Sequence, residues 1–217
     1  MKRIFDLFFA CILVLLLLPF LLLIAFAIRI SSPGPILFKQ KRIGLNGKVF
    51  LIYKFRSMVS DAEFTGTGLF SFDNDPRITF VGKFLRQYSL DELPQLFNII
   101  NGSMSLVGPR PPVTYELGPW DSYTPYMRRR FKVKPGITGL AQVSGRNQLS
   151  WDEKLYYDNK YVDLFLRRGL FVDLYILFKT FYVVIAAFNT VESERSVDDA
   201  SNTVSGRAYS AGRPDKN

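Results

Sequence analysis

Residues 86–98 read Arg86-Gln-Tyr-Ser-Leu-Asp-Glu-Leu-Pro-Gln-Leu-Phe-Asn98, a segment that sets two adjacent carboxylates, Asp91 and Glu92, inside a strongly basic chain. Apolar residues recur here at helical spacing, at Leu90, Leu93, Phe97 and Ile100. This spacing predicts a helix with one apolar face and its carboxylates near the amino end, which is the end that favours negative charge. Cationic surroundings would keep such acids ionised and hold anions beside them.

The same residues also fit a purely structural role. Ser89 followed by Glu92 three positions later makes a capping box, in which both side chains satisfy backbone N–H groups at the start of a helix. Because a proline is comfortable only in the first turn of a helix, Pro94 allows the helix to begin at either Ser89 or Asp91. Both starts leave the two acids at the amino end.

Composition bounds the class of protein. The chain has 217 residues, 48% of them hydrophobic and 15% aromatic, which is enough for one ordinary domain with an appendage. Its formal net charge of +9 indicates an anionic partner, which could be a nucleic acid, an acidic membrane surface or a phosphorylated substrate.

The chain lacks histidine, and its one cysteine, Cys11, lies in an apolar run. These facts exclude disulfides, thiolate catalysis and zinc sites of the Cys/His kind. Any metal must therefore be a hard ion bound by oxygen, and any chemistry must rest on carboxylates, lysine, arginine, tyrosine or hydroxyls.

Residues 7–28 form a run of 22 without a charge. As a helix it would measure roughly 33 Å, long enough to enter or cross a bilayer, and Pro19 in its middle favours a kink. Basic residues flank the run on both sides, at Lys2, Arg3, Arg29, Lys39, Lys41 and Arg42. A spanning helix should carry them mainly on one side, so the pattern favours a helix that enters the membrane, breaks and returns over one that spans it.

Two runs rich in aromatic and β-branched residues, 36–44 and 48–58, flank the turn Gly44-Leu-Asn-Gly47 and predict a β-hairpin. A period of two places Lys54 and Arg56 on one face of the second strand. Residues 60–75 are polar, contain glycine and lack periodicity, which predicts a mobile loop.

Three later segments carry candidate binding groups. Prolines on both sides of Arg110 stiffen its backbone, which suits phosphate binding, although an ordinary proline-stiffened connection fits as well. Residues 128–134 form a basic cluster with interleaved apolar residues, suited to anionic lipid headgroups or to a solvated face. Residues 135–147 are rich in glycine and end in Arg146 and Asn147, which could line a polar site.

Helical spacing predicts two further helices, over 151–168 and 170–188. The first mixes tyrosines with charges, as is typical of a membrane interface or of a helix over a core. In the second, Asp173 and Lys179 interrupt an apolar run, which favours an interfacial or core-packed helix over a second membrane span. Residues 189–217 are polar, which predicts a disordered tail.

Six motifs follow one another along residues 2–188: Lys2-Arg-Ile-Phe-Asp-Leu7, Ser32-Pro-Gly-Pro35, Tyr53-Lys-Phe-Arg-Ser-Met58, Ser89-Leu-Asp-Glu-Leu-Pro-Gln-Leu-Phe-Asn98, Val107-Gly-Pro-Arg-Pro111 and Lys134-Pro-Gly-Ile-Thr-Gly-Leu-Ala-Gln-Val-Ser-Gly-Arg-Asn147. Each motif alone is weak, but six in this order are specific. On these motifs the chain resembles the bacterial sugar transferase family, the monotopic phosphoglycosyl transferases that begin assembly of capsule, exopolysaccharide, O-antigen and glycoprotein glycans.

The resemblance implies an α+β, mostly helical monotopic membrane protein with an N-terminal re-entrant hydrophobic helix, a small β-hairpin and interfacial amphipathic helices. We expect a re-entrant membrane helix (1–30), a cytoplasmic membrane-associated catalytic domain (31–188) and a polar tail (189–217), located at the bacterial inner membrane. Some family members have serine before the helix-breaking proline, whereas here Leu18 precedes Pro19, so one hydroxyl that could satisfy freed backbone groups is missing.

The resemblance also implies a reaction, the transfer of sugar-1-phosphate from a UDP-sugar to undecaprenyl phosphate with release of UMP. Asp91 corresponds to a nucleophile that forms a covalent phosphosugar intermediate, and Glu92 would help to hold Mg²⁺ or the geometry of the site, so both are expected catalytic residues and metal ligands. The expected substrate-binding residues are Lys54, Arg56 and Arg86 for the phosphates, Arg110 for the nucleotide side, and Arg146 and Asn147 as further polar contacts.

The expected partners are the UDP-sugar donor, the undecaprenyl phosphate acceptor and anionic membrane lipids, with a second copy of the chain and downstream glycosyltransferases as further candidates. Nucleic acid is not expected, because no nucleic-acid-binding motif accompanies the charge. A non-catalytic, basic, membrane-anchored scaffold is the alternative, and it would need neither Asp91 nor Glu92.

Overall fold

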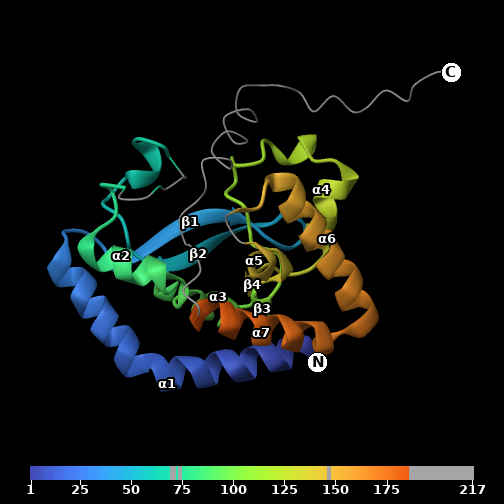
Figure 1. Cartoon of the computed structure of the whole chain (residues 1–217), viewed down its shortest axis with the longest axis horizontal. Coiled ribbons are helices and arrows are strands. Elements are labelled where there is room, and N and C mark those ends of the chain that lie inside the picture. Colours follow the sequence, from blue (N-terminus) through green and yellow to red (C-terminus); the bar gives the residue numbers. More distant parts are fainter. Residues whose placement is uncertain (69–71, 73–74, 146–147, 186–217) are drawn as a thin grey trace.

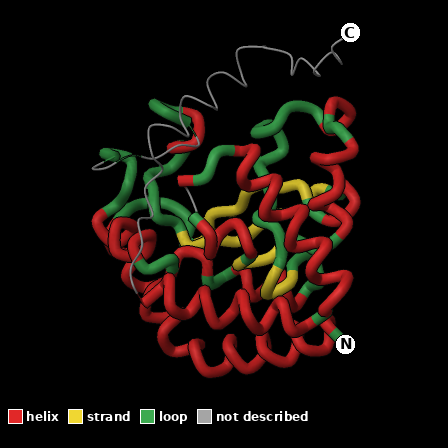
Figure 2. The backbone as a smooth tube through the Cα atoms, turned by 45° about the vertical axis from the view of Figure 1, so that its right-hand side comes forward, coloured by secondary structure: helices red, strands yellow, loops and turns green. Residues whose placement is uncertain are grey.

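The computed structural model describes residues 1–68, 72, 75–145 and 148–185, which form a mostly helical body around a β-hairpin. The helices are α1 (Lys2–Ser31), α2 (Phe80–Gln87), α3 (Gln95–Ile100), α4 (Pro125–Arg129), α5 (Leu140–Ser144), α6 (Trp151–Arg168) and α7 (Leu170–Ile185). The strands are β1 (Leu37–Ile43), β2 (Val49–Phe55), β3 (Ser105–Val107) and β4 (Gly136–Thr138). Figure 1 shows α1 along the lower edge with α7 above its first half, and Figure 2 shows the strands surrounded by helices.

The apolar N-terminal run forms α1, which continues through Pro19 without a break. Figure 1 shows that α1 bends about midway, as expected of a proline that removes one helical hydrogen bond and crowds the preceding turn. Among the described helices, α1 is the one long and apolar enough to cross a membrane by length and composition. The predicted apolar helix is confirmed, and it is kinked where we expected a break.

Both ends of α1 are fastened to the rest of the protein. At its start, Arg3 donates hydrogen bonds to the carbonyls of Ile99 and Ile100, which close α3. At its end, the Arg56 guanidinium, just beyond β2, donates to the carbonyl of Ser32 at 2.7 Å and to its hydroxyl at 2.9 Å. The helix is therefore held at its two ends by the same body.

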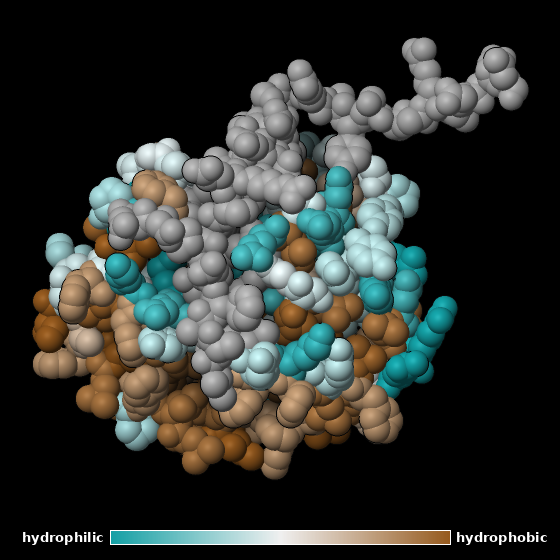
Figure 3. All heavy atoms as spheres, in the orientation of Figure 1, coloured by the Kyte–Doolittle hydropathy of each residue, from teal (hydrophilic) through white to brown (hydrophobic). Residues whose placement is uncertain are grey.

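Apolar side chains remain exposed on one side of the molecule. Figure 3 shows them gathered along the lower edge, where α1 lies. The most exposed of them on α1 are Ile4, Leu15, Leu16, Leu22, Leu23, Phe26 and Ile30, and on α7 Phe171, Phe178, Phe181 and Tyr182. The opposite side of α7 is buried through Val172 and Ile176, so this helix is both packed on the core and apolar on its outer face.

The predicted hairpin is confirmed. β1 and β2 pair antiparallel with Leu37 opposite Phe55 and Ile43 opposite Val49, and the turn at 45–47 joins them. Asn46 and Gly47 take left-handed backbone angles there, with φ of 54° and 78°, which asparagine and glycine tolerate best. A short parallel pair, β3 with β4, was not predicted, because three-residue strands give too little periodicity to recognise.

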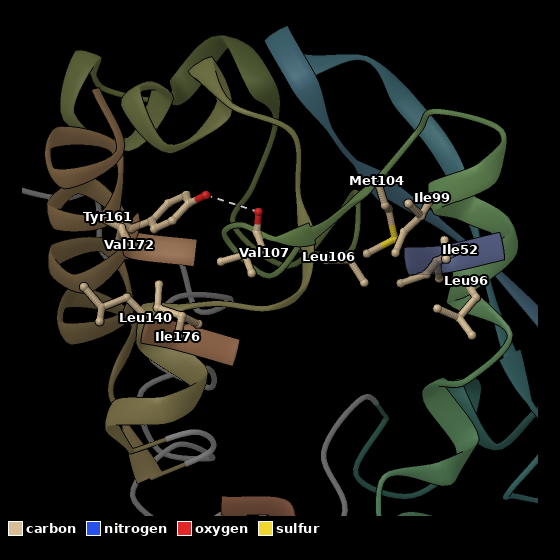
Figure 4. Close-up of a cluster of buried hydrophobic side chains, with 11 residues drawn as sticks. Ile52, Leu96, Ile99, Met104, Leu106, Val107, Leu140, Tyr161, Val172 and Ile176 are labelled. Carbon is tan, nitrogen blue, oxygen red and sulfur yellow. Dashed lines mark hydrogen bonds between the residues drawn. The ribbon is translucent and has the colours of Figure 1, made fainter. Parts of the chain in front are cut away.

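The main core cluster joins seven elements that are far apart in the sequence. Figure 4 shows Ile52, Leu96, Ile99 and Met104 on one side of it and Leu140, Val172 and Ile176 on the other. The hydroxyl oxygen of buried Tyr161 lies 3.2 Å from the Val107 carbonyl oxygen, which places α6 beside β3. Burial of this apolar surface is the main stabilisation that such a fold has.

Of the two charged residues that interrupt the apolar run of α7, Asp173 is buried. Asp173 accepts hydrogen bonds from Lys2 and, at 2.8 Å, from the Tyr161 hydroxyl. Nearby, Asp6 of α1 accepts from the backbone N–H of Leu106. Because buried charges persist only when paired, these contacts explain why two apolar helices carry charged residues at this point.

The loop at 60–75 is held by one buried side chain in its described part. Arg77 donates to the carbonyls of Ala62 and Gly68, at 2.7 and 2.9 Å, and pairs with Asp75 at 2.7 Å. A guanidinium has five donors, which suits it to gather carbonyls from an irregular segment. This loop lies beside the cavity described next.

Candidate active site

The two adjacent acids lie in a tight 3₁₀ turn, Leu90–Glu92, which we call the acid turn. The predicted continuous helix is wrong here, because α3 begins only at Gln95, after the ring of Pro94, which has no N–H to donate. The predicted capping box is wrong as well, since Ser89 has a left-handed backbone with φ of 57° and makes no side-chain cap hydrogen bond. The shifted register also leaves Phe97 45% exposed, whereas we placed it on the apolar face.

Asn98 fixes the acid turn relative to the hairpin. Its fully buried side chain accepts from the backbone N–H of Tyr53 at 2.9 Å and donates to the carbonyl of Leu51 at 2.7 Å. The amide thus takes the place of a third strand beside β2, and Lys54, the next residue of β2, reaches the acid turn. Sequence reasoning missed Asn98, although an asparagine inside an apolar helical pattern is itself a signal.

Glu92 binds two cations with one oxygen. Its Oε1 lies 2.9 Å from Lys54 Nζ and 2.9 Å from Arg110 Nη1. Burial alone would raise the pKa of Glu92, but the charges of Arg110 and Lys54 outweigh it and hold that pKa well below its usual range. Glu92 therefore stays ionised and joins the acid turn, β2 and the loop that carries Arg110.

Asp91 has the opposite environment. It is 7% exposed, and within the described residues its carboxylate has neither a hydrogen bond nor an ion pair. Burial raises the pKa of Asp91; the charge of Lys54 opposes this, and those of Arg86 and Arg110 oppose it more weakly. A carboxylate that is close to cations without being bound to one remains available to react with a ligand.

The loop around Arg110 is braced from behind. Arg42 of β1 donates to the Pro111 carbonyl at 2.9 Å, and Arg130 donates to the carbonyl of Arg110. Arg130 is buried and pairs with buried Asp158 of α6 at 2.8 Å. The predicted lipid-facing or solvated role of 128–134 is therefore wrong for Arg130, whose guanidinium is part of the interior.

The remaining predicted site residues have different positions and contacts in the structure. Arg86 lies at the end of α2 near Asp91, whose pKa it lowers. Arg56 lies one residue beyond β2, and its guanidinium donates to Ser32 at the end of α1, but Arg56 also lines the same cavity as Lys54. Arg146 and Asn147 lie outside the described residues.

These groups face one cavity of about 1120 Å³. Lys54, Arg86, Asp91 and Arg110 line what we call its phosphate end, and Arg56 also contributes to the wall. The volume exceeds the usual range for a small-molecule site, and three cations beside a buried acid suit an anionic ligand with more than one charge.

Comparison with known proteins identifies the family. The model of the family described as bacterial sugar transferase matches residues 1–187. This chain belongs to the bacterial sugar transferase family.

Curated relatives of this bacterial sugar transferase fall into two size classes. The undecaprenyl-phosphate galactose phosphotransferase of Salmonella typhimurium is 40% identical over 85% of this chain, and the UDP-glucose:undecaprenyl-phosphate glucose-1-phosphate transferase of Klebsiella pneumoniae is 42% identical over 83%. The chain spans only 40% and 39% of the length of these two relatives. The exopolysaccharide production protein ExoY of Rhizobium meliloti is 42% identical over 82% of this chain and 83% of the relative.

The acid turn of the bacterial sugar transferase can supply part of a magnesium site. Within the described residues no group of three or more His, Cys, Asp or Glu side chains could hold a metal alone. Mg²⁺ is often held by one or two carboxylates together with substrate phosphates and waters, and Asp91 in a cavity that three cations also line fits that pattern. Glu92 fits less well, because its Oε1 is already bound to Lys54 and Arg110.

The environment of Asp91 predicts a gain in stability when its charge is removed. Because the pKa of Asp91 is raised in the folded protein, its contribution to folding is present below the unfolded pKa, about 3.9, and is lost as the pH rises through the folded pKa. Asp91→Asn should therefore raise the unfolding temperature in detergent at pH 8 by roughly 2–4 °C, the shift that about 1 kcal/mol produces in a domain of this size.

The advantage of Asp91→Asn over the unmodified protein should shrink between pH 8 and pH 4.5. Asp163→Asn is the matched control, since Asp163 is 42% exposed and pairs only at the surface with Arg129. A loss of stability in Asp91→Asn at pH 8, or an effect that does not vary with pH, would contradict this account of the site.

Proposed function

We propose that this protein transfers sugar-1-phosphate from a UDP-sugar to undecaprenyl phosphate, with release of UMP, and so starts the assembly of a bacterial surface or glycoprotein glycan. The observation that carries the proposal is the contrast within the acid turn, where Glu92 is bound by Lys54 and Arg110 while buried Asp91 has no partner among the residues that the structure describes. The names of the relatives, which include transferases for galactose, glucose and N-acetylgalactosamine phosphates, support the reaction class.

In the first step, a carboxylate oxygen of Asp91 attacks the β-phosphorus of the donor. The bond from that phosphorus to the bridging oxygen breaks, UMP leaves with the oxygen, and the sugar phosphate remains on Asp91. Lys54, Arg86 and Arg110 offset the charge of the diphosphate, which an anionic nucleophile otherwise could not approach.

In the second step, a phosphate oxygen of undecaprenyl phosphate attacks the same phosphorus, and the Asp91 carboxylate leaves. Two steps let a soluble donor and a membrane-bound acceptor use one cavity in turn. The site is suited to this order because Asp91 is held by no other residue that the structure describes, so departure breaks only the bond to phosphorus.

A magnesium ion held by Asp91 and the donor diphosphate, with Glu92 as the second candidate ligand, would neutralise phosphate oxygens and favour the ionised form of Asp91. The chain's own residues do the remaining work. Glu92 keeps Lys54 and Arg110 within reach of the phosphates. We assign Arg110, whose loop Arg130 holds, to the nucleotide side of the diphosphate.

We further propose that α1 enters the inner membrane from the cytoplasmic face and returns to it, with the catalytic part on that face. The support is geometric, because Arg3 fastens the start of α1 and Arg56 fastens its end to one body. A straight helix of 30 residues would measure about 45 Å and separate those ends across a bilayer.

Activity should depend on Asp91 far more than on any other acid. With Mg²⁺, a panel of UDP-sugars and undecaprenyl phosphate, we expect the unmodified protein to release UMP with at least one donor. Asp91→Asn should lower the rate at least about 1000-fold, as removal of a nucleophile does, and Glu92→Gln about 10- to 100-fold, as loss of a positioning group does. UMP release would be measured with a coupled assay.

Asp163→Asn serves as the control and should keep the unmodified rate, because it is distant in sequence and partly exposed on α6. No UMP release with any donor, or an active Asp91→Asn variant, would contradict the proposed reaction and leave the membrane-anchored scaffold as the better explanation.

The topology predicts that both ends of α1 face the cytoplasm. In a Cys11→Ser background, single cysteines would be placed after Met1 and, by Pro35→Cys, just beyond α1. A membrane-impermeant maleimide should label neither in intact cells and both after lysis. Labelling of the first cysteine alone in intact cells would show a spanning helix instead.

A further inference from the structure

The same cavity has a second group of lining residues with different chemistry, and we call this part its second end. Trp151, Lys154 and Asp158 all line it, and their spacing of three and four residues places them on one face of α6. Arg130 also lines it, with its guanidinium over the Trp151 ring at 5.7 Å. Since Arg130 and Asp158 neutralise each other, this end offers an aromatic surface with little net charge from that pair.

Several buried polar atoms at this end have no hydrogen-bond partner among the described residues. They are Nε and Nη1 of Arg130, Oδ1 of Asp158, and both amide atoms of Gln142 on α5. Native proteins pair almost all such atoms, so a cluster of exceptions calls for an explanation. Donors and acceptors are both present, which is what a hydroxyl, an amide or an imide requires of its site.

The side chain of Gln142 lies beside the loop that carries Arg110. A Cβ on Gly139 would lie 2.7 Å from Gln142 Oε1 and 2.2 Å from the carbonyl oxygen of Gly108, two residues before Arg110. Because glycine has no side chain, residue 139 leaves space for the side-chain amide of Gln142. The second end of the cavity and the phosphate end meet at this loop, because Arg130 donates to the Arg110 carbonyl.

We propose that Arg130, Gln142, Trp151 and Asp158 form a ring subsite, which binds an uncharged, hydrogen-bonding ring of the donor while its diphosphate occupies the phosphate end. The inference rests on the proposed function. A diphosphate donor carries a polar ring on each side, the nucleoside and the sugar, and both share the chemistry that the subsite offers. Aromatic contact and unpaired donors and acceptors are features that bind such rings.

Gln142→Leu tests the subsite without breaking a bond of the fold, because the amide has no partner among the residues described. Binding would be measured by calorimetry in the Asp91→Asn background with Mg²⁺, so that the donor is not consumed. The ligands are the UDP-sugar that gives the highest UMP release, UDP, and inorganic diphosphate. We expect Gln142→Leu to weaken UDP-sugar about tenfold or more and to leave diphosphate unchanged.

UDP separates the two rings. If UDP weakens together with UDP-sugar, the subsite holds the nucleoside; if only UDP-sugar weakens, it holds the sugar. Gln95→Leu is the matched control, because Gln95 is also buried, its amide nitrogen has no partner among the described residues, and it does not line the cavity. This substitution should leave all three affinities unchanged.

Equal affinities for all three ligands in Gln142→Leu and the unmodified protein would overturn the subsite and assign the amide to bound water. A tenfold loss that appears equally for diphosphate would also overturn it, because the substitution would then act on the whole cavity. Failure of the proposed function looks different, since the protein would then bind no UDP-sugar before any substitution at Gln142.

Discussion

The carboxylate of Glu92 draws Lys54 and Arg110 to a single oxygen, and the rest of the site depends on that junction. Lys54 comes from the hairpin, Arg110 from the proline-stiffened loop, and Glu92 from the acid turn, so one anion sets the distances among three segments that are far apart in the sequence. Without it, Lys54, which is mostly buried, and Arg110, whose side chain is 44% exposed, would repel each other.

This junction also makes the neighbouring acid different. Because Glu92 takes the direct contacts, Asp91 is left near three cations without a partner in the described part of the chain, and burial raises its pKa. A protein selected only for stability would gain by replacing such a group, so its presence is a cost that function explains better than folding does. The exposed apolar side chains of α1 are also better explained by function, since apolar surface left in water does not stabilise the folded protein.

The parts of the fold that follow from local chemistry could be predicted from the sequence. The glycines at 44 and 47 predict the hairpin, and the helical spacing of apolar residues in 151–168 predicts α6 with the same bounds. The acid turn could not be predicted, because the left-handed backbone of Ser89 and the late start of α3 arise from packing against β2 through Asn98. Hydrophobic periodicity reflects only residues that are close together in the chain, so it does not report contacts with a distant strand.

The roles of the individual arginines could not be predicted from the sequence either, because every arginine carries the same charge. Burial and partners separate them: Arg56 caps α1, Arg77 gathers a loop, Arg130 braces the Arg110 loop, and Arg110 itself reaches the acid turn. Which sugar the donor carries is likewise set by contacts that no motif encodes.

The central claim is that Asp91 carries the sugar phosphate between the two substrates. The most direct measurement is to incubate the protein and Mg²⁺ with UDP-sugar labelled in the β-phosphate, omit undecaprenyl phosphate, and locate the label by peptide mapping. We predict label on the peptide that contains Asp91, none in Asp91→Asn, and its release when undecaprenyl phosphate is added. An active protein that never acquires label would contradict the claim and indicate direct transfer from donor to acceptor.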